Sequence, residues 1–193
     1  GIKNIGIVDD DKVDMSNLNR QILFNTKDIG KFKVIQAKKF LQKVNKMLKI
    51  NTYKLKIIKK NIQNILSKYD IICDCSDNFT TRYLLNDFCL KNKKILISAA
   101  INKFEAHVFN FNFSKKIPCY RCFMPEIPSE EDKCDTEGIL PTVAGIAGTL
   151  QANEVVKSIL SKKDMLVGKM IVFNTLNLNF RTIKLTRSAD CVM

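Results

Sequence analysis

The sequence predicts an α/β protein of the Rossmann-like kind, with a mostly parallel sheet, helices on both faces and an antiparallel C-terminal extension. Two observations predict this. Short apolar runs alternate with helical patterns over the first hundred residues, which is typical of a parallel sheet with covered faces. Near the C-terminus, two apolar runs follow closely, as in a hairpin. A chain of 193 residues fits one domain over 1–193.

Short runs of β-branched and apolar residues predict the strands of the sheet. Three such runs lie between polar residues, at 4–9, 70–75 and 94–100, which is the pattern of a buried strand. Alternation of apolar and polar residues predicts two more strands, at 53–59 and 104–113. The strand at 104–113 should be antiparallel, with one face in water.

Apolar residues recurring every three or four positions predict helices at 31–49, 79–92 and 142–161. The stretch 114–141 contains all four prolines and many acidic residues, so we expect it to be mostly loop. The runs at 169–175 and 180–186 predict the closing hairpin.

Composition excludes several classes of protein. No apolar run reaches the roughly 18 residues that span a bilayer, and there is no secretory signal, which predicts a cytoplasmic protein without a membrane partner. The seven cysteines are odd in number, which favours a reducing compartment over a disulfide framework. The net charge of +13 is spread over scattered lysines. Without an arginine-rich or aromatic-interleaved stripe, we expect no nucleic-acid partner.

Acidic residues follow two of the predicted strands. Asp9 begins the segment DDDKVDMSNLNRQILF, and CSDN at 75–78 follows the strand at 70–75. Ligands of such sheets bind beyond the carboxyl ends of the strands, so we expect both clusters to face one crevice. A carboxylate there can accept hydrogen bonds from both hydroxyls of a ribose, whereas the alternative is a solvated turn. No GxGxxG phosphate loop occurs in the sequence.

Five features follow one another along the chain: DDDKVDMSNLNRQILF, Lys33, CSDN, CYRC and GTLQANEVVK. In this order they closely resemble the ThiF/MoeB/HesA family, the bacterial relatives of ubiquitin-activating enzymes. The resemblance covers the whole chain but enters late, since the family's opening strand, GxGGxG loop and first helix would precede Gly1. Because the chain starts with Gly rather than Met, we expect it to be processed or part of a longer product.

Family members bind ATP and magnesium and adenylylate the C-terminal glycine carboxylate of a small ubiquitin-like sulfur carrier. The resemblance therefore implies an adenylyltransferase whose partner is a carrier ending in Gly-Gly, and a homodimer, as is usual in the family. The motifs do not separate thiamine-thiazole from molybdopterin synthesis, although CYRCFMP looks slightly more like the thiamine branch. The alternative function is a non-catalytic fragment or scaffold that binds a sulfur carrier without ATP turnover.

The resemblance implies a nucleotide-binding role for each matching residue near the N-terminus. Asp9 would hold the ribose. The phosphates would be approached by Asn17, Arg20, Gln21 and Lys33. Arginine offers a planar fork to phosphate oxygens and lysine a compact point charge. Taken alone, Arg20 would more readily be a surface ion-pair partner and Lys33 a solvated lysine; the ordered set of motifs is what favours the functional roles.

The resemblance also implies that Asp77 coordinates magnesium, with Asn78 beside it. One carboxylate is enough, because magnesium is commonly held by one or two carboxylates together with phosphate oxygens. Arg20, Lys33 and Asp77 would be the catalytic residues. The attack of a carboxylate on a phosphate brings two anions together, so catalysis needs positioning and charge neutralisation.

Cys119 and Cys122 form a CxxC in the predicted loop, and Cys191 lies near the C-terminus. A tetrahedral zinc site needs four ligands, and the family has a second CxxC whose last cysteine would fall at position 194. Three thiolates with a water, or with a residue outside the sequence, are both open. A redox dithiol is disfavoured, because we do not expect this CxxC to open a helix after a strand.

The remaining cysteines and the single histidine have other expected roles. In the thiamine branch, a cysteine at the position of Cys134 can bond the carrier's thiocarboxylate. The acidic neighbours in PSEEDKCDTEG would raise its pKa, so both a chemical role and none are open. Cys73, Cys75 and Cys89 lie in apolar patterns that predict core positions. His107 should have a structural or solvent-facing role.

Overall fold

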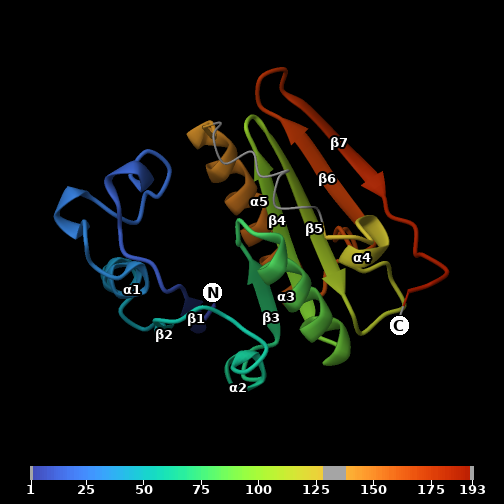
Figure 1. Cartoon of the computed structure of the whole chain (residues 1–193), viewed down its shortest axis with the longest axis horizontal. Coiled ribbons are helices and arrows are strands. Elements are labelled where there is room, and N and C mark those ends of the chain that lie inside the picture. The colour runs from blue at the N-terminus through green and yellow to red at the C-terminus, as the bar shows by residue number, and fades with distance from the viewer. Residues whose placement is uncertain (1, 128–137, 192–193) are drawn as a thin grey trace. The chain divides into compact units, whose positions relative to one another are not determined.

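The computed structural model describes residues 2–127 and 138–191. The chain divides into two compact units, Gly1–Ile58 and Lys59–Met193, and each is described by itself (Figure 1). None of the helices in the described ranges is long and apolar enough to cross a bilayer. That residues 1–193 act as one nucleotide-binding domain stays a prediction.

The first unit contains a two-stranded parallel sheet and one long helix. β1 (Asn4–Val8) pairs with β2 (Lys49–Tyr53), and α1 (Lys33–Val44) packs against β2. Two short 3-10 turns, Met15–Asn17 and Thr26–Asp28, lie between β1 and α1.

The strand predicted at 53–59 is wrong, because β2 ends where that stretch begins. All five residues of β1 are already paired with Lys49–Tyr53. Residues 54–58 therefore have no partner strand in this sheet, although their sequence alternates. Ile50 within β2 is buried, and so is Ile57 beyond the end of the strand.

The second unit contains a five-stranded sheet in the order β3-β4-β5-β6-β7. The strands are β3 (Ile71–Asp74), β4 (Ile95–Asn102), β5 (Glu105–Asn112), β6 (Lys169–Asn174) and β7 (Asn179–Lys184). β3 and β4 are parallel and the later neighbours antiparallel, so the closing hairpin and the antiparallel extension are confirmed. A short helix that the sequence did not predict, α2 (Ile62–Leu66), precedes β3.

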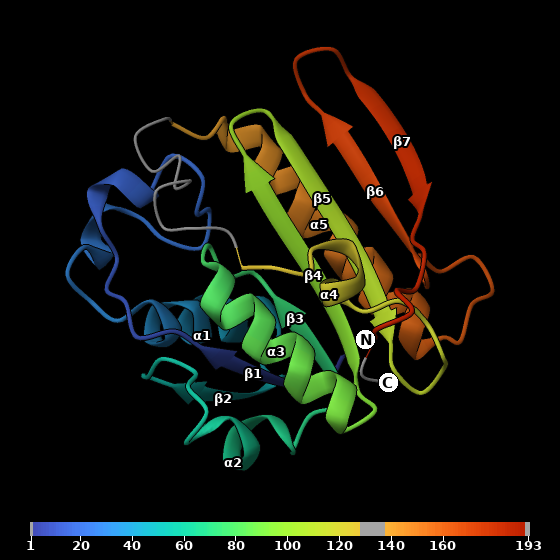
Figure 2. The same ribbon diagram turned by 45° about the vertical axis from the view of Figure 1, so that its right-hand side comes forward.

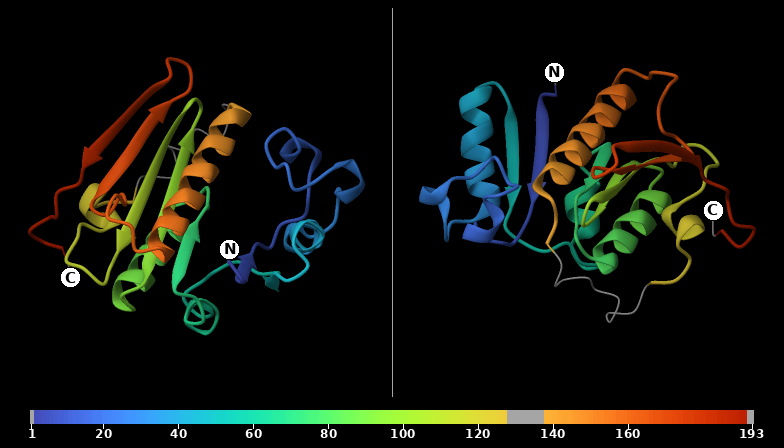
Figure 3. Two further views of the ribbon diagram at one scale, coloured as in Figure 1. Left: turned by 180° about the vertical axis from the view of Figure 1, so that it is seen from behind. Right: turned by 90° about the horizontal axis from the view of Figure 1, so that it is seen from above.

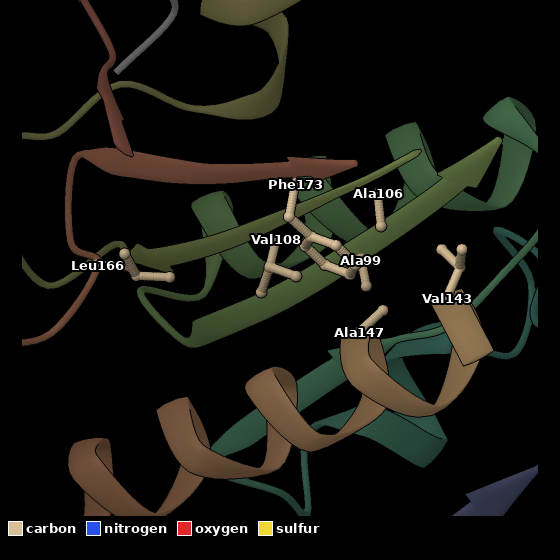
Figure 4. Packing of buried hydrophobic residues seen from close by; sticks show 7 residues of the cluster. All are labelled: Ala99, Ala106, Val108, Val143, Ala147, Leu166 and Phe173. Carbon is tan, nitrogen blue, oxygen red and sulfur yellow. The ribbon is translucent and has the colours of Figure 1, made fainter. Parts of the chain in front are cut away.

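Two long helices cover opposite faces of this sheet (Figures 2 and 3). α3 (Phe79–Lys91) connects β3 to β4 and packs on these two strands, while α5 (Pro141–Ile159) packs on β4 and β5. Helices on both faces are thus confirmed. Figure 4 shows the apolar cluster between α5 and the sheet, formed by Ala99, Ala106, Val108, Val143, Ala147, Leu166 and Phe173.

The expectation that β5 has one face in water is wrong for its C-terminal half. Val108, Phe109, Asn110 and Phe111 are buried in succession. Val108 belongs to the cluster beneath α5, whereas the aromatic rings of α4 (Tyr120–Phe123) cover the other face. The Tyr120 ring lies 5.6 Å from that of Phe109. The alternating sequence of β5 cannot show this cover, because it comes from another element, α4.

Candidate functional site

Three adjacent carboxylates follow β1 in the first unit. The side-chain oxygens of Asp9, Asp10 and Asp11 lie within 4.8 Å of one another. The Asp9 carboxylate accepts a hydrogen bond from the Asp11 amide at 2.8 Å. Burial raises the pKa of Asp9, and the two acidic neighbours raise it further, while that amide and Lys33 lower it. The fold therefore holds this carboxylate in a place that disfavours its charge.

Substitution of Asp9 by asparagine should not destabilise the protein at neutral pH. The folded state raises the pKa of Asp9, so the charged form is a cost that is present above the folded pKa and absent below the unfolded pKa of about 3.9. The asparagine side chain carries no charge, so the Asp9→Asn variant should melt at the same or a higher temperature at pH 7. The difference should vanish below about pH 4. Calorimetry across pH tests this, and a lower melting temperature for the variant at pH 7 contradicts it.

Lys33 is brought beside this acidic cluster by a short backbone pairing. The Val13 amide donates to Lys31, and the Lys33 amide donates to Asp11, with N–O distances of 2.8 and 3.0 Å. Gly30 makes the turn with a φ of 78°, which favours glycine. The Lys33 ammonium then lies 2.8 Å from the Asp11 carboxylate. This ammonium is therefore already oriented within the first unit.

Asn17, Arg20 and Gln21 share one turn, because the amides of Arg20 and Gln21 both donate to the Asn17 carbonyl. The Arg20 guanidinium donates to the Ser16 carbonyl at 3.1 Å and to the Asn19 side chain at 3.0 Å. Within the described residues it has no acidic partner, so the ion-pair alternative gains no support. The buried side-chain oxygen of Gln21 has no donor in this part of the chain.

The second cluster, Cys75–Asn78, follows β3 in the second unit. Asn78 caps α3, since its side-chain oxygen accepts from the Thr81 amide at 2.8 Å. Its side-chain amide donates to the Asp77 carboxylate at 3.3 Å. Asp77 is exposed and has no cationic partner among the residues described. This carboxylate is available to a cation from outside the chain.

A buried polar network beneath Asp77 was not predicted from the sequence. Asp74 and Arg82 form an ion pair at 2.8 Å, and both side chains are almost fully buried. The Ser98 hydroxyl joins them, at 2.7 Å from Asp74 and 2.6 Å from Arg82. The signal that could have revealed it is the aspartate inside the apolar run DIICDC, because a buried carboxylate requires a partner.

Three cysteine sulfurs meet at the second candidate centre. The Cys119 sulfur lies 3.8 Å from that of Cys122 and 3.9 Å from that of Cys191. A tetrahedral zinc with Zn–S bonds of about 2.3 Å requires sulfur–sulfur distances of about 3.8 Å. Two sulfur–sulfur distances match this value and all three sulfurs lie within 4.8 Å of one another, so the three residues can supply three corners of a zinc site. Burial, followed by the neighbouring thiols, raises the pKa of Cys119, which disfavours a thiolate unless a cation is bound.

The structure corrects two expectations about cysteines. Cys119 does open a helix, since it is the N-cap of the four-residue α4. The raised pKa of Cys119 nevertheless argues against a redox dithiol. Cys73 and Cys75 are exposed rather than core residues, because β3 is at the sheet edge, although the Cys75 sulfur donates to the Gln151 side chain on α5 at 3.5 Å. Cys89 is buried as predicted.

Two other residues complete this inventory. Cys134 lies outside the described residues. His107 sits on β5, where its Nε2 is 3.1 Å from the Glu105 carboxylate and its ring packs edge-on against Phe123.

The sequence model of the ThiF family matches residues 1–193. The chain belongs to the ThiF family. The family resemblance of the ordered motifs is thus confirmed.

Named ThiF-like relatives share a large part of this chain. A "Probable molybdopterin-synthase adenylyltransferase" of Pyropia yezoensis is 45% identical over 181 residues, 92% of this chain and 48% of that protein. The "Adenylyltransferase and sulfurtransferase MOCS3" of Culex quinquefasciatus is 38% identical over 195 residues, 100% of this chain and 44% of that protein. The "Sulfur carrier protein adenylyltransferase" of Thermus thermophilus is 34% identical over 197 residues, 99% of this chain and 73% of that protein. The chain thus spans less than half of the first two relatives.

Solved structures support the fold. The crystal structure of E. coli MccB with MccA-N7isoASN has a TM-score of 0.85 and 24% identity, and the match covers 100% of this chain and 59% of that one. This likeness concerns the fold alone, and it confirms the Rossmann-like class of this ThiF-family chain.

Proposed function

We propose that the full-length protein is an adenylyltransferase that uses ATP and magnesium to activate the C-terminal glycine of a ubiquitin-like sulfur carrier. Membership of the ThiF family over the whole chain carries this proposal. Relatives named as adenylyltransferases of sulfur carriers and molybdopterin synthase support it. Because these names include the molybdopterin branch, its carrier is the first to test.

The proposed reaction joins two anions. An oxygen of the glycine carboxylate forms a bond to the α-phosphorus of ATP, and the bond from this phosphorus to the oxygen bridging to the β-phosphate breaks. Pyrophosphate leaves with that electron pair, and the carrier becomes an acyl adenylate. The enzyme's task is therefore to orient the reactants and offset negative charge, without a covalent group of its own.

Each side chain has a role that its surroundings support. Asp9, desolvated at the end of β1, would accept the ribose hydroxyls. Arg20 and Lys33 would neutralise phosphate oxygens, and the turn of Asn17 and Gln21 would place the guanidinium. Bound magnesium would lower the charge on the phosphates.

Asp77 fits the role of magnesium ligand, since its carboxylate is exposed and touches only the Asn78 amide among the interactions described. Asn78 would then orient this carboxylate rather than bind the ion, because the oxygen of its side chain is used to cap α3. Asp77 would thus be the magnesium ligand, and Asn78 would hold it in place.

The cysteine centre is proposed to hold a structural zinc. Cys119, Cys122 and Cys191 supply three thiolates, and a water or a residue outside the sequence supplies the fourth ligand. The zinc would fasten the C-terminal segment to α4. We also propose that the protein acts as a homodimer, as family resemblance implies.

Pyrophosphate exchange tests the proposed function. The full-length protein should incorporate labelled pyrophosphate into ATP only when magnesium and a carrier ending in Gly-Gly are both present. The matched control is the same carrier without its last glycine, which places the carboxylate one residue short and should give no exchange. Absence of exchange with an intact carrier that nevertheless binds would overturn the proposal and favour the non-catalytic scaffold.

A further inference from the structure

The turn that carries Asp77 is hydrogen-bonded to the buried carboxylate of Asp74, and both oxygens of this carboxylate accept hydrogen bonds from the protein. Asp74 ends β3 and is 1% exposed, opposite Ser98 in the parallel ladder. One of its oxygens accepts from the Ser76 amide at 3.0 Å and from the Ser76 hydroxyl at 2.6 Å. The other accepts from Arg82 at 2.8 Å and from Ser98 at 2.7 Å. No lone pair of this carboxylate is directed to a ligand.

Arg82 reaches the same turn from α3. One terminal nitrogen of its guanidinium donates to Asp74, to Ser98 and to the Ala99 carbonyl, the last at 3.1 Å. The other terminal nitrogen donates to the Ser76 carbonyl at 2.7 Å. Asp74 thus holds the amide of Ser76 and Arg82 holds its carbonyl, so the two peptide groups that flank Ser76, the second of which leads into Asp77, are each held by one of these side chains.

The opposite face of the sheet contributes a second support. Gln151 on α5 donates its side-chain amide to the Asp74 carbonyl at 2.9 Å and to the Ile97 carbonyl at 3.1 Å. These contacts tie the carboxyl end of β3 to the neighbouring residue Ile97 of β4. Since α3 and α5 lie on opposite faces of the sheet (Figure 3), Asp74 at the start of the turn is held from both faces.

Arg82 differs from Arg20 and Lys33 because its guanidinium is not accessible to a ligand. It is 4% exposed, and the protein acceptors described above occupy both terminal nitrogens. Its guanidinium carbon also lies 5.7 Å from the centre of the Tyr120 ring. This buried cation therefore cannot contact a nucleotide. A buried ion pair is a costly way to gain stability alone, whereas it can fix one geometry.

From these contacts we propose that Arg82 and Asp74 are positioning residues, which act through Ser76 to hold the Asp77 carboxylate in place for magnesium. The inference rests on the proposed function and deepens its magnesium site. A partner that orients a metal ligand commonly changes metal affinity by 10-fold to 100-fold. Loss of the Arg82 guanidinium should therefore weaken magnesium binding more than it weakens binding of the carrier.

The test uses Arg82→Lys in the full-length protein. Lysine keeps the charge near Asp74, but its single nitrogen cannot hold both Asp74 and the Ser76 carbonyl. The magnesium concentration for half-maximal pyrophosphate exchange should rise about tenfold, while the KM for the carrier changes less than about twofold. Melting temperatures are measured in parallel so that exchange is assayed where every variant is folded.

Glu154→Gln is the matched control. Glu154 is also buried and polar, and it accepts from Asn110 and from the Leu166 amide, each at 2.9 Å, but it does not contact the Asp77 turn. It should lower stability and leave the magnesium midpoint unchanged. Equal shifts in both variants, or none in Arg82→Lys, would overturn the inference.

Ser76→Ala decides the question if Arg82→Lys does not fold. It removes only the 2.6 Å hydroxyl contact to Asp74 and leaves the amide contact in place, so the midpoint should rise by less than in Arg82→Lys, and no shift overturns the inference. Failure of the proposed function gives a different result, since the unchanged protein would then show no magnesium-dependent exchange at all.

Discussion

Substitution of Cys119 by serine is expected to remove zinc from the full-length protein and to lower its melting temperature by about 8–16 °C. The Cys119 sulfur lies close to both of the others, at 3.8 Å from Cys122 and 3.9 Å from Cys191, so its loss leaves two cysteines that cannot hold zinc tightly by themselves. A metal at a thousandfold excess over its Kd stabilises the folded state by about 4 kcal/mol. Each kcal/mol corresponds to about 2–4 °C for a domain of about 150–250 residues, the range in which this chain falls.

Elemental analysis and scanning calorimetry measure the two effects. Cys73→Ser is the control, because this thiol is exposed on β3 and belongs to no metal cluster among the described residues. It should keep one zinc per chain and the melting temperature of the unchanged protein. A chelator should lower the melting temperature of the unchanged protein and leave that of Cys119→Ser unaffected. Full zinc content in Cys119→Ser would refute the assignment.

The fold was predictable where its signals are local. The β-branched runs of β1, β3 and β4 and the helical periodicity of α1, α3 and α5 are each contained within a short stretch. The strand predicted at 53–59 failed because pairing is long-range. β2 is defined by its register with β1, in which Ile5 faces Ile50, and no pattern within 49–59 states that register.

The sequence was sufficient to predict the candidate ligand-binding residues, but not the buried residues that hold them in place. Lys33 and Asp77 were identified from family motifs, and their roles stay predictions. Arg82 was missed because its partner Asp74 lies on another element and looks like part of an apolar strand. Likewise, the exposure of Cys73 depends on β3 being an edge strand, which is a property of the sheet and not of the sequence around it.

The ion pair between Lys33 and Asp11 was also not predicted from the sequence. The carboxylate 2.8 Å from the Lys33 ammonium could suggest a cation already used for stability. In this pair 65% of the Asp11 side chain and 13% of the Lys33 side chain are exposed, so water reaches the contact from the carboxylate side and screens it toward the range of about 0–1 kcal/mol found for exposed ion pairs. The contact therefore orients Lys33 at little cost, and in the proposed function phosphate oxygens would replace the carboxylate as its partner.

Lys33→Ala is accordingly expected to lower kcat/KM for pyrophosphate exchange by about 10²–10³, as does the loss of one group that stabilises charge in a transition state. Lys31→Ala is the matched control. Its side chain is 51% exposed, and its ammonium lies 3.9 Å from Asp28, away from the Asp11 contact. Both variants lose one positive charge from the same segment, so a general electrostatic effect would weaken exchange equally.

The expected contrast is a large loss for Lys33→Ala, a change below about twofold for Lys31→Ala, and melting temperatures close to that of the unchanged protein for both. Similar activities would show that Lys33 acts only through net charge. A loss in Lys33→Ala that follows a fall in melting temperature would instead make it a structural residue. Only a loss of exchange in a stable Lys33→Ala variant, with Lys31→Ala unaffected, places the Lys33 ammonium at the reacting phosphates.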